Sequence, residues 1–194
     1  MATTRADNQR ENPTVTDDKI KHAANWMARM TVNGVAPSDF FDVLNSLTRW
    51  EDWCAAFSAR AKTHEDMGRA ALAKEQFVSA GEHLARAAAT YHFAKYLFVN
   101  DMAQMRAAHM KAVDCLTLAL PHLDPPGERV LIPYQGKQLA GTLRRPGGIE
   151  RPPLVLMTMG LDSTKEELVS FEDTFLRRGV AILARGSDTA PQPT

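Results

Sequence analysis

The residues best placed to do chemistry are the run Met159-Gly-Leu-Asp-Ser-Thr-Lys-Glu-Glu167, which follows the apolar residues 153–158. A glycine at the end of a buried strand lets the backbone approach a bound molecule closely, because glycine has no Cβ. One interpretation of this stretch is therefore a turn whose backbone N–H groups face a ligand. An ordinary strand-to-helix turn explains the same local pattern, since Asp162 and Ser163 are both residue types that cap helices.

The other polar residues form weaker candidate sites. His64-Glu65 lacks the second histidine of the zinc motif His-Glu-x-x-His, because Gly68 stands in that place. The remaining central histidines have no ligand-like spacing, and we expect helix-surface or satisfied core positions for His83, His92 and His109. The chain contains no Walker-type or dinucleotide-binding loop. We therefore expect no metal site and no cofactor.

The elements that must position the turn fall into two kinds, and the first is helical. From Thr16 to about Leu123, apolar and aromatic residues recur at helical spacing, with helices predicted to begin near Asp17, Ser38, Trp50, Ser79 and Met102. Ser79–Glu82 has capping-box spacing, which predicts a fresh helix start, and Gly68 is a candidate break. We expect residues 16–123 to form one helical domain with a core of Trp50, Trp53, Phe57, Tyr91 and Phe93.

The second kind begins after Asp124-Pro-Pro-Gly127, which predicts a linker over residues 124–127. Residues 128–145 predict a hairpin around Gln135-Gly136, and 153–159 a strand covered on both faces. A helix is expected over residues 164–178, with inward side chains Leu168, Phe171, Phe175 and Leu176. A strand is expected to follow over residues 180–184. Residues 128–184 thus predict the opening of a mixed α/β sheet, and we expect Arg144-Arg145 and Arg177-Arg178 to be solvated ends.

Composition narrows the class of protein. The 194 residues contain 23 Lys+Arg and 23 Asp+Glu, and this neutral balance argues against nucleic acid and anionic membranes as partners. Cys54 and Cys115 are expected to be buried reduced thiols. No apolar run has the length of a membrane span, and residues 1–15 lack the apolar core of a signal peptide. The sequence therefore predicts a cytoplasmic protein with a disordered lead-in over residues 1–15.

The order of the predicted elements resembles the first third of an α/β-hydrolase domain. These elements are a hairpin, a strand and turn with the sequence Pro-Leu-Val-Leu-Met-Thr-Met-Gly-Leu-Asp-Ser, a helix and a second strand. Joined to a helical domain containing Trp50-Glu-Asp-Trp53, it is similar to the helical-capped, esterase-like group that includes 2,6-dihydroxypseudooxynicotine hydrolase. The resemblance covers roughly residues 17–184. It implies an all-helical cap followed by an incomplete α/β-hydrolase sheet. It also implies a small-molecule substrate cleaved at an ester or an activated carbon–carbon bond next to a carbonyl, and the possibility of a homodimer.

The resemblance gives the turn a specific role. In this superfamily the turn after the third strand donates a backbone N–H to the oxyanion hole. Aligning Met159-Gly160 with the usual His-Gly pair assigns the donating amide to Leu161 and the close-approach turn to Gly160. Asp162 or Ser163 would cap the helix that follows. The resemblance identifies no substrate-binding residue.

The family's catalytic triad has no counterpart in this chain. It needs a serine in Gly-x-Ser-x-Gly, then an acid, then a histidine, but the chain has no such motif and all six histidines lie at or before His122. We therefore expect the chain as given to be inactive. Residues 185–194 are polar and patternless where the family continues with a glycine-rich loop. We interpret them as an aberrant tail left by a frameshift, with a divergent short natural product as the alternative.

A different class of function stays open from the residues alone. The segment 71–98 alternates small and aromatic residues in the way of tetratricopeptide-like helical hairpins, which would make the chain a protein-interaction module. No second copy follows at a period of about 34 residues, and such repeats stack in several copies.

Overall fold

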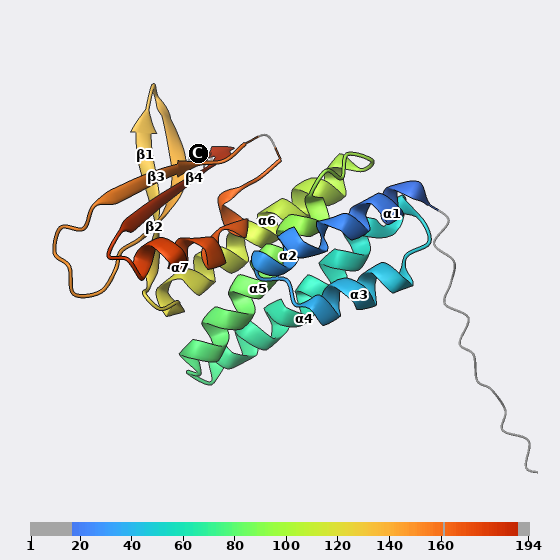
Figure 1. Cartoon of the computed structure of the whole chain (residues 1–194), viewed down its shortest axis with the longest axis horizontal. Helices are drawn as coiled ribbons and strands as arrows, with labels where there is room; N and C mark the ends of the chain where they lie inside the picture. Colours follow the sequence, from blue (N-terminus) through green and yellow to red (C-terminus); the bar gives the residue numbers. More distant parts are fainter. Residues whose placement is uncertain (1–16, 161, 190–194) are drawn as a thin grey trace, which may run out of the picture.

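The computed structural model describes residues 17–160 and 162–189. Figure 1 shows that the molecule has a helical part and a sheet part. Helices fill one end of the molecule, and a four-stranded sheet with one helix forms the other. The disordered lead-in expected for residues 1–15 lies outside the described residues. Within them, no helix is both long and apolar enough to cross a membrane.

The helical part matches the expectation of nearly continuous helix. Its elements are α1 (Asp18–Ala23), η1 (Ala24–Trp26), α2 (Met27–Val32), α3 (Pro37–Ser46), η2 (Trp50–Asp52), α4 (Trp53–Ala73), α5 (Phe77–Lys95), α6 (Met102–Ala119) and η3 (Leu120–His122). Two aspartates cap helices as their residue type favours. Asp17 accepts from the amide of Lys19, and Asp101 accepts from the amides of Ala103 and Gln104.

The structure contradicts one prediction about the long helices, the capping box, and decides one question that the sequence left open, the candidate break at Gly68. α5 begins at Phe77, so Ser79–Glu82 lies inside the first turns and does not form the predicted capping box. α4 runs unbroken through Gly68. A Cβ at Gly68 would lie 2.6 Å from Leu84 Cγ, so this glycine lets α4 and α5 approach closely.

The core of the helical part is aromatic, and it contains the five residues predicted from the sequence. Trp53, Phe57 and Phe93 are fully buried, and Trp50 and Tyr91 are nearly so. Trp53 Nε1 donates to the Phe93 carbonyl at 3.0 Å, which satisfies its polar group in the core. Trp26 packs edge-on against Tyr96, with ring centroids 5.0 Å apart. Cys54 and Cys115 are free and buried, as expected.

The sheet part has strands β1 (Gly127–Tyr134), β2 (Lys137–Arg144), β3 (Leu154–Thr158) and β4 (Ala181–Thr189), in the order β1-β2-β4-β3. The predicted hairpin is confirmed: β1 and β2 are antiparallel around Gln135 and Gly136, whose φ angles are 47° and 74°. β3 and β4 are parallel, so the chain between them crosses over through η4 (Lys165–Glu167) and α7 (Val169–Leu176).

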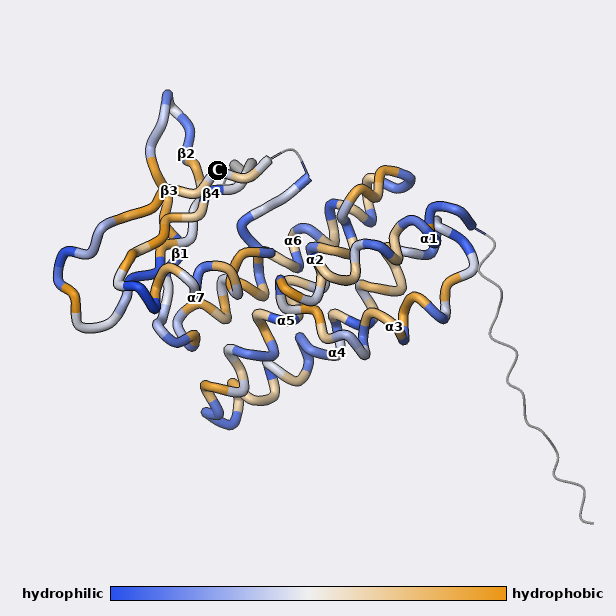
Figure 2. Tube along the Cα trace, viewed as in Figure 1, coloured by the Kyte–Doolittle hydropathy of each residue, from blue (hydrophilic) through white to orange (hydrophobic). Residues whose placement is uncertain are grey.

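Three details of the sheet part differ from the prediction. The helix expected over residues 164–178 is the short η4 followed by α7, and Phe171 is 44% exposed instead of pointing inward. Figure 2 shows hydrophobic residues along β3, but Leu154 and Leu156 are 56% and 60% exposed, so the described residues cover only one of its faces. β4 extends to Thr189 and pairs there with Leu139 of β2, so residues 185–189 belong to a strand.

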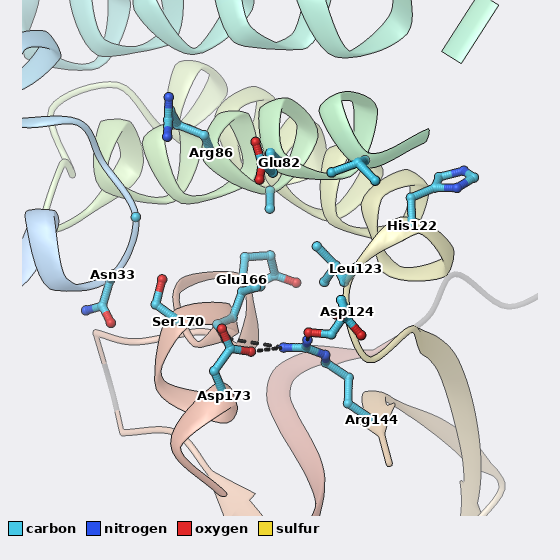
Figure 3. A pocket seen from close by; sticks show the side chains of 14 residues that line it. Asn33, Glu82, Arg86, His122, Leu123, Asp124, Arg144, Glu166, Ser170 and Asp173 are labelled. Carbon is cyan, nitrogen blue, oxygen red and sulfur yellow. Dashed lines mark hydrogen bonds and ion pairs between the residues drawn. The ribbon is translucent and has the colours of Figure 1, made fainter. Parts of the chain in front are cut away.

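Arg144 was expected at a solvated end, and it is instead buried at 2% exposure. Its guanidinium donates to the carbonyls of Asp124 and Pro125 at 3.2 and 3.0 Å and to the Asp173 carboxylate at 3.0 Å, the last drawn in Figure 3. It also lies 3.3 Å from Glu172 Oε2. This single side chain therefore joins the linker, the end of β2 and α7. Its neighbour Arg145 is exposed, as predicted.

Candidate active-site turn and its contacts with the helical part

The candidate turn leaves the sheet at the carboxyl end of β3, where Thr158 is followed by Met159 and Gly160. Leu161, whose amide is the predicted oxyanion donor, lies outside the described residues. Gly160 is exposed, and a Cβ built on it would meet only Asp162 Oδ1, at 3.9 Å. No packing contact within the described residues requires glycine at this position, so the space beside its Cα is open to a ligand.

Arg29 and Tyr96 of the helical part hold the far side of the turn. Tyr96 donates its hydroxyl hydrogen to Asp162 Oδ2 at 2.8 Å and accepts from Arg29 Nη1 at 2.6 Å. The guanidinium carbon of Arg29 lies 4.6 Å from the centre of the Tyr96 ring. The Tyr96 bond is the main reason that the pKa of Asp162 is lowered, while burial raises the pKa of Tyr96 to about 12. Asp162 is therefore a carboxylate at neutral pH.

A second set of contacts holds the start of η4. Arg29 Nη2 donates to Ser163 Oγ at 2.6 Å and to Glu167 Oε1 at 2.9 Å. His92 of α5 lies on the other side of Glu167, with its Nε2 3.2 Å from Oε2, and its Nδ1 is 2.9 Å from Thr164 Oγ1. Together these side chains tie the turn to α2 and α5. We call Arg29, His92, Tyr96, Asp162 and Glu167 the turn anchor.

Burial sets the charge state of the anchor. Burial lowers the pKa of His92, which is 0% exposed, so the ring is neutral at pH 7. Burial alone would raise the pKa of Glu167, but hydrogen bonds from His92, Arg29 and Ser163 outweigh it and lower the pKa to about 2. The anchor at neutral pH is thus one guanidinium between two carboxylates.

The anchor corrects the predicted role of Asp162 and Ser163. Neither caps a helix: the residue before η4 is Thr164, which makes no side-chain cap hydrogen bond. Both side chains bind Arg29 instead. Sequence reasoning missed Arg29, His92 and Tyr96, because these contacts span 66 to 138 residues and no local periodicity marks them.

We expect the Glu167→Gln variant to unfold more easily than the wild type at pH 7, by up to about 3 kcal/mol, because it removes the carboxylate that Arg29 faces. A carboxyl group whose pKa falls on folding, here from 4.5 to about 2, stabilises the protein above pH 4.5. That contribution is lost as the pH falls toward 2. Urea unfolding at pH 7, 5 and 3 should therefore show the difference between the two proteins shrinking below pH 4.5. A Glu150→Gln control, on the exposed loop before β3, should show no such trend.

Of the cavities that border the crossover, two also reach the helical part. One, of about 420 Å³, lies between α5, the linker and α7, and Figure 3 shows charges of both signs around it, including Glu82, Arg86 and Glu166. The other is a groove of about 690 Å³ that is widely open to solvent; it lies between α2, the end of β3 and α7, and its lining is mostly apolar. The groove includes Met159, so it is the one that adjoins the candidate turn.

The histidines noted in the sequence have structural contacts. His64 Nε2 is 2.6 Å from Asp39 Oδ2, and His64 Nδ1 is 3.4 Å from His83 Nδ1. Among the described residues, no group of three or more His, Cys, Asp or Glu is arranged to hold a metal ion. His64 is therefore a core residue whose two ring nitrogens face Asp39 and His83, and His92 is a fully buried core residue whose Nδ1 faces Thr164.

Comparison with known proteins places this arrangement in a family. The model of the family described as "Esterase FrsA-like" matches residues 27–188. The chain is 32% identical over 160 residues to 2,6-dihydropseudooxynicotine hydrolase of Paenarthrobacter nicotinovorans, covering 81% of this chain and 42% of that protein. It is 31% identical over 145 residues to the alpha/beta hydrolase xenA of Xenoacremonium sinensis, covering 70% of this chain and 33% of that protein.

Solved structures agree. The crystal structure of 2,6-dihydroxy-pseudo-oxynicotine hydrolase superposes with a TM-score of 0.74 at 29% identity, over 83% of this chain and 45% of that one. AbyA5 superposes with a TM-score of 0.59 at 19% identity, over 84% of this chain and 44% of that one, and shares the fold. The chain spans less than half the length of each of these relatives. With its helical cap and partial α/β-hydrolase sheet, the chain belongs to the FrsA-like esterase family of α/β-hydrolases.

Proposed function

We propose that this chain supplies the helical cap and the oxyanion-hole turn of a serine-type α/β-hydrolase, which cleaves an ester or an activated carbon–carbon bond next to a carbonyl in a small molecule. The observation that carries the proposal is the turn anchor. Arg29 and Tyr96 fix Asp162, the residue directly after the predicted donor amide. A donor that is held in place before the reaction stabilises a developing oxyanion without a reorganisation cost.

The open space at Gly160 supports the same role. A substrate carbonyl must come within hydrogen-bonding distance of the donor amide. Among the described residues, the only atom within 4 Å of a Cβ built on Gly160 is Asp162 Oδ1, at 3.9 Å, so there is room for that approach. The helical part supplies the opposite wall through α2. In this proposal it excludes water from the site and restricts which substrates enter.

In this proposal these 194 residues supply neither the nucleophile nor the base, since they contain no Gly-x-Ser-x-Gly motif and no histidine after His122. Thr164, His92 and Glu167 do form a hydroxyl–imidazole–carboxylate chain, with contacts of 2.9 and 3.2 Å. That arrangement has the order of a catalytic triad. However, Thr164 is 6% exposed and His92 0%, so an acyl substrate cannot reach them. We assign this chain of contacts to anchoring the turn.

The reading as a helical interaction module has less support. A tetratricopeptide array consists of stacked helical hairpins. Here the helical part packs against a crossover and a four-stranded sheet, and the family match extends across both.

The proposal is tested by assaying the 194-residue protein with activated aryl esters and a fluorophosphonate probe. We expect no turnover and no stoichiometric labelling, because the oxyanion donor has no nucleophile to assist. Co-expression with the portion of 2,6-dihydropseudooxynicotine hydrolase that this chain does not match should restore esterase activity. Labelling of Thr164 or any serine in the chain alone would overturn the proposal, and so would a soluble, folded complex of the two pieces without activity.

A further inference from the structure

Two histidines of the helical part face each other through ring nitrogens. His64 of α4 and His83 of α5 are 19 residues apart in the sequence, and their Nδ1 atoms lie 3.4 Å apart. The two helices pack along each other (Figure 1), and Gly68, about one turn after His64, lets them approach closely. The contact between the rings therefore comes from the packing of the helices, and no ligand-like spacing in the sequence marks it.

Asp39 of α3 fixes which nitrogen of His64 carries a hydrogen. Its Oδ2 lies 2.6 Å from His64 Nε2, and a carboxylate oxygen only accepts hydrogen bonds. His64 Nε2 therefore carries the hydrogen, which leaves the lone pair of the neutral ring on Nδ1, facing His83. Asp39 and His64 are both buried, and Arg60 lies 3.5 Å from the other oxygen of Asp39. The orientation of the His64 ring is thus fixed by the groups behind it.

The spacing of the two Nδ1 atoms suits metal ligands better than a direct hydrogen bond. N–H···O hydrogen bonds in proteins usually span about 2.7–3.2 Å, and the Nδ1 atoms are 3.4 Å apart. Two nitrogens bound to one tetrahedral zinc ion, each at about 2.0–2.1 Å, lie about 3.3–3.4 Å from each other. A histidine that binds a metal also commonly donates its other ring N–H to a carboxylate. His64 and Asp39 have this arrangement.

The pair can be reached from solvent and lies apart from the candidate turn. His83 is half-buried, so one ring has an open side. It comes nine residues before His92 on α5, which places it roughly 13 Å along the helix from the turn anchor. Among residues 17–160 and 162–189, no third His, Cys, Asp or Glu joins the pair in a metal-binding group. Two protein ligands therefore leave room for water at the remaining positions.

We propose that the Nδ1 atoms of His64 and His83 bind Zn²⁺, with Asp39 as the positioning residue and water completing the coordination. Imidazole nitrogen suits zinc, whereas Mg²⁺ and Ca²⁺ select oxygen ligands. The ion joins α4 to α5, so its binding stabilises the folded helical part. This inference does not rest on the proposed function, because neither histidine belongs to the turn anchor.

Zinc binding is measured on the 194-residue protein, prepared without a histidine tag, by isothermal titration calorimetry at pH 7.5. We expect saturable binding of one Zn²⁺ per chain and no binding of Mg²⁺. Long-range ¹H–¹⁵N spectra should show that Zn²⁺ shifts the Nδ1 signals of His64 and His83, while His64 Nε2 keeps its hydrogen. Zn²⁺ should also raise the midpoint of thermal unfolding, and EDTA should reverse this rise.

A matched pair of variants locates the site. His83→Gln should weaken zinc binding at least about tenfold and remove the rise in the unfolding midpoint, because only one histidine ligand remains. His22→Gln is the control, since His22 is exposed on α1 and contacts Trp26, and it should leave zinc binding unchanged. Asp39→Asn should weaken zinc binding about 10–100-fold, the usual effect of losing the carboxylate behind a histidine ligand. Circular dichroism establishes that each variant is folded.

The contrary outcomes are distinct. Absence of saturable zinc binding, or equal zinc affinity in His83→Gln and His22→Gln, would overturn the site. One Zn²⁺ per two chains would overturn its completion by water, because a second copy would then supply the missing ligands. Ring signals that show His83 Nδ1 donating to His64 Nδ1, unchanged by Zn²⁺, would reduce the pair to a structural hydrogen bond. None of these results bears on esterase activity in the co-expressed pair, so this inference and the proposed function fail separately.

Discussion

Replacing Arg144 by alanine should lower the free energy of unfolding by about 3–5 kcal/mol, because its buried guanidinium is the shared donor of two carbonyl and two carboxyl groups that lose their partner. Arg144 and Glu172 are each 2% exposed, and their closest atoms are 3.3 Å apart. Burial raises the pKa of Glu172 to about 7 even with Arg144 present. Without the guanidinium, the Asp124 and Pro125 carbonyls also lose their donor.

Arg145→Ala provides the matched control, because the neighbouring arginine is 57% exposed and pairs with an equally exposed Glu128. Its removal should change the free energy of unfolding by less than about 1 kcal/mol. Urea unfolding followed by circular dichroism measures both variants. If Arg144→Ala is too unstable to purify, Arg144→Lys should show a smaller loss, since it keeps one charge but cannot reach all the acceptors. Equal effects of Arg144→Ala and Arg145→Ala would contradict the structural assignment.

The Gly160→Val variant should lower kcat by about 10²–10³-fold in the co-expressed, active pair, with a much smaller change in KM. A branched side chain would occupy the space that the described residues leave open, and would keep the substrate carbonyl from the donor amide. Because that amide acts mainly on the developing oxyanion, the loss should appear in kcat. Steady-state kinetics with an activated aryl ester measures both constants.

Gly147→Val is the control for this variant. A Cβ on Gly147 meets no atom within 4 Å, so a side chain there is also tolerated by the fold, but it lies on the loop before β3 and away from the turn. It should leave kcat and KM unchanged. Unchanged turnover in Gly160→Val would reduce Gly160 to a structural turn residue. A rise in KM at constant kcat would indicate a binding surface in place of an oxyanion hole.

The sequence by itself determined the local elements and their order. Helical spacing of apolar residues located the helices and the aromatic core, including Trp53 and Phe57, because burial of one helix face imposes that period. Gln135-Gly136 determined the hairpin, since its turn needs positive φ angles that few residues adopt. The glycine turn after β3 was also predictable as a candidate site from its position after an apolar run.

Only the tertiary structure decided what holds that turn and which charges are buried. Arg29 and Glu167 are 138 residues apart, and Arg144 lies 28 residues from Glu172, so neither pair leaves a periodic trace in the sequence. A charged residue is normally expected at the surface, and burial is tolerated only where partners from distant segments meet it. Phe171 illustrates the converse. The spacing of Phe171 from the other apolar residues of the predicted helix matches a buried helix face. In the structure that helix is divided into η4 and the shorter α7, and the Phe171 ring lines the groove beside the turn.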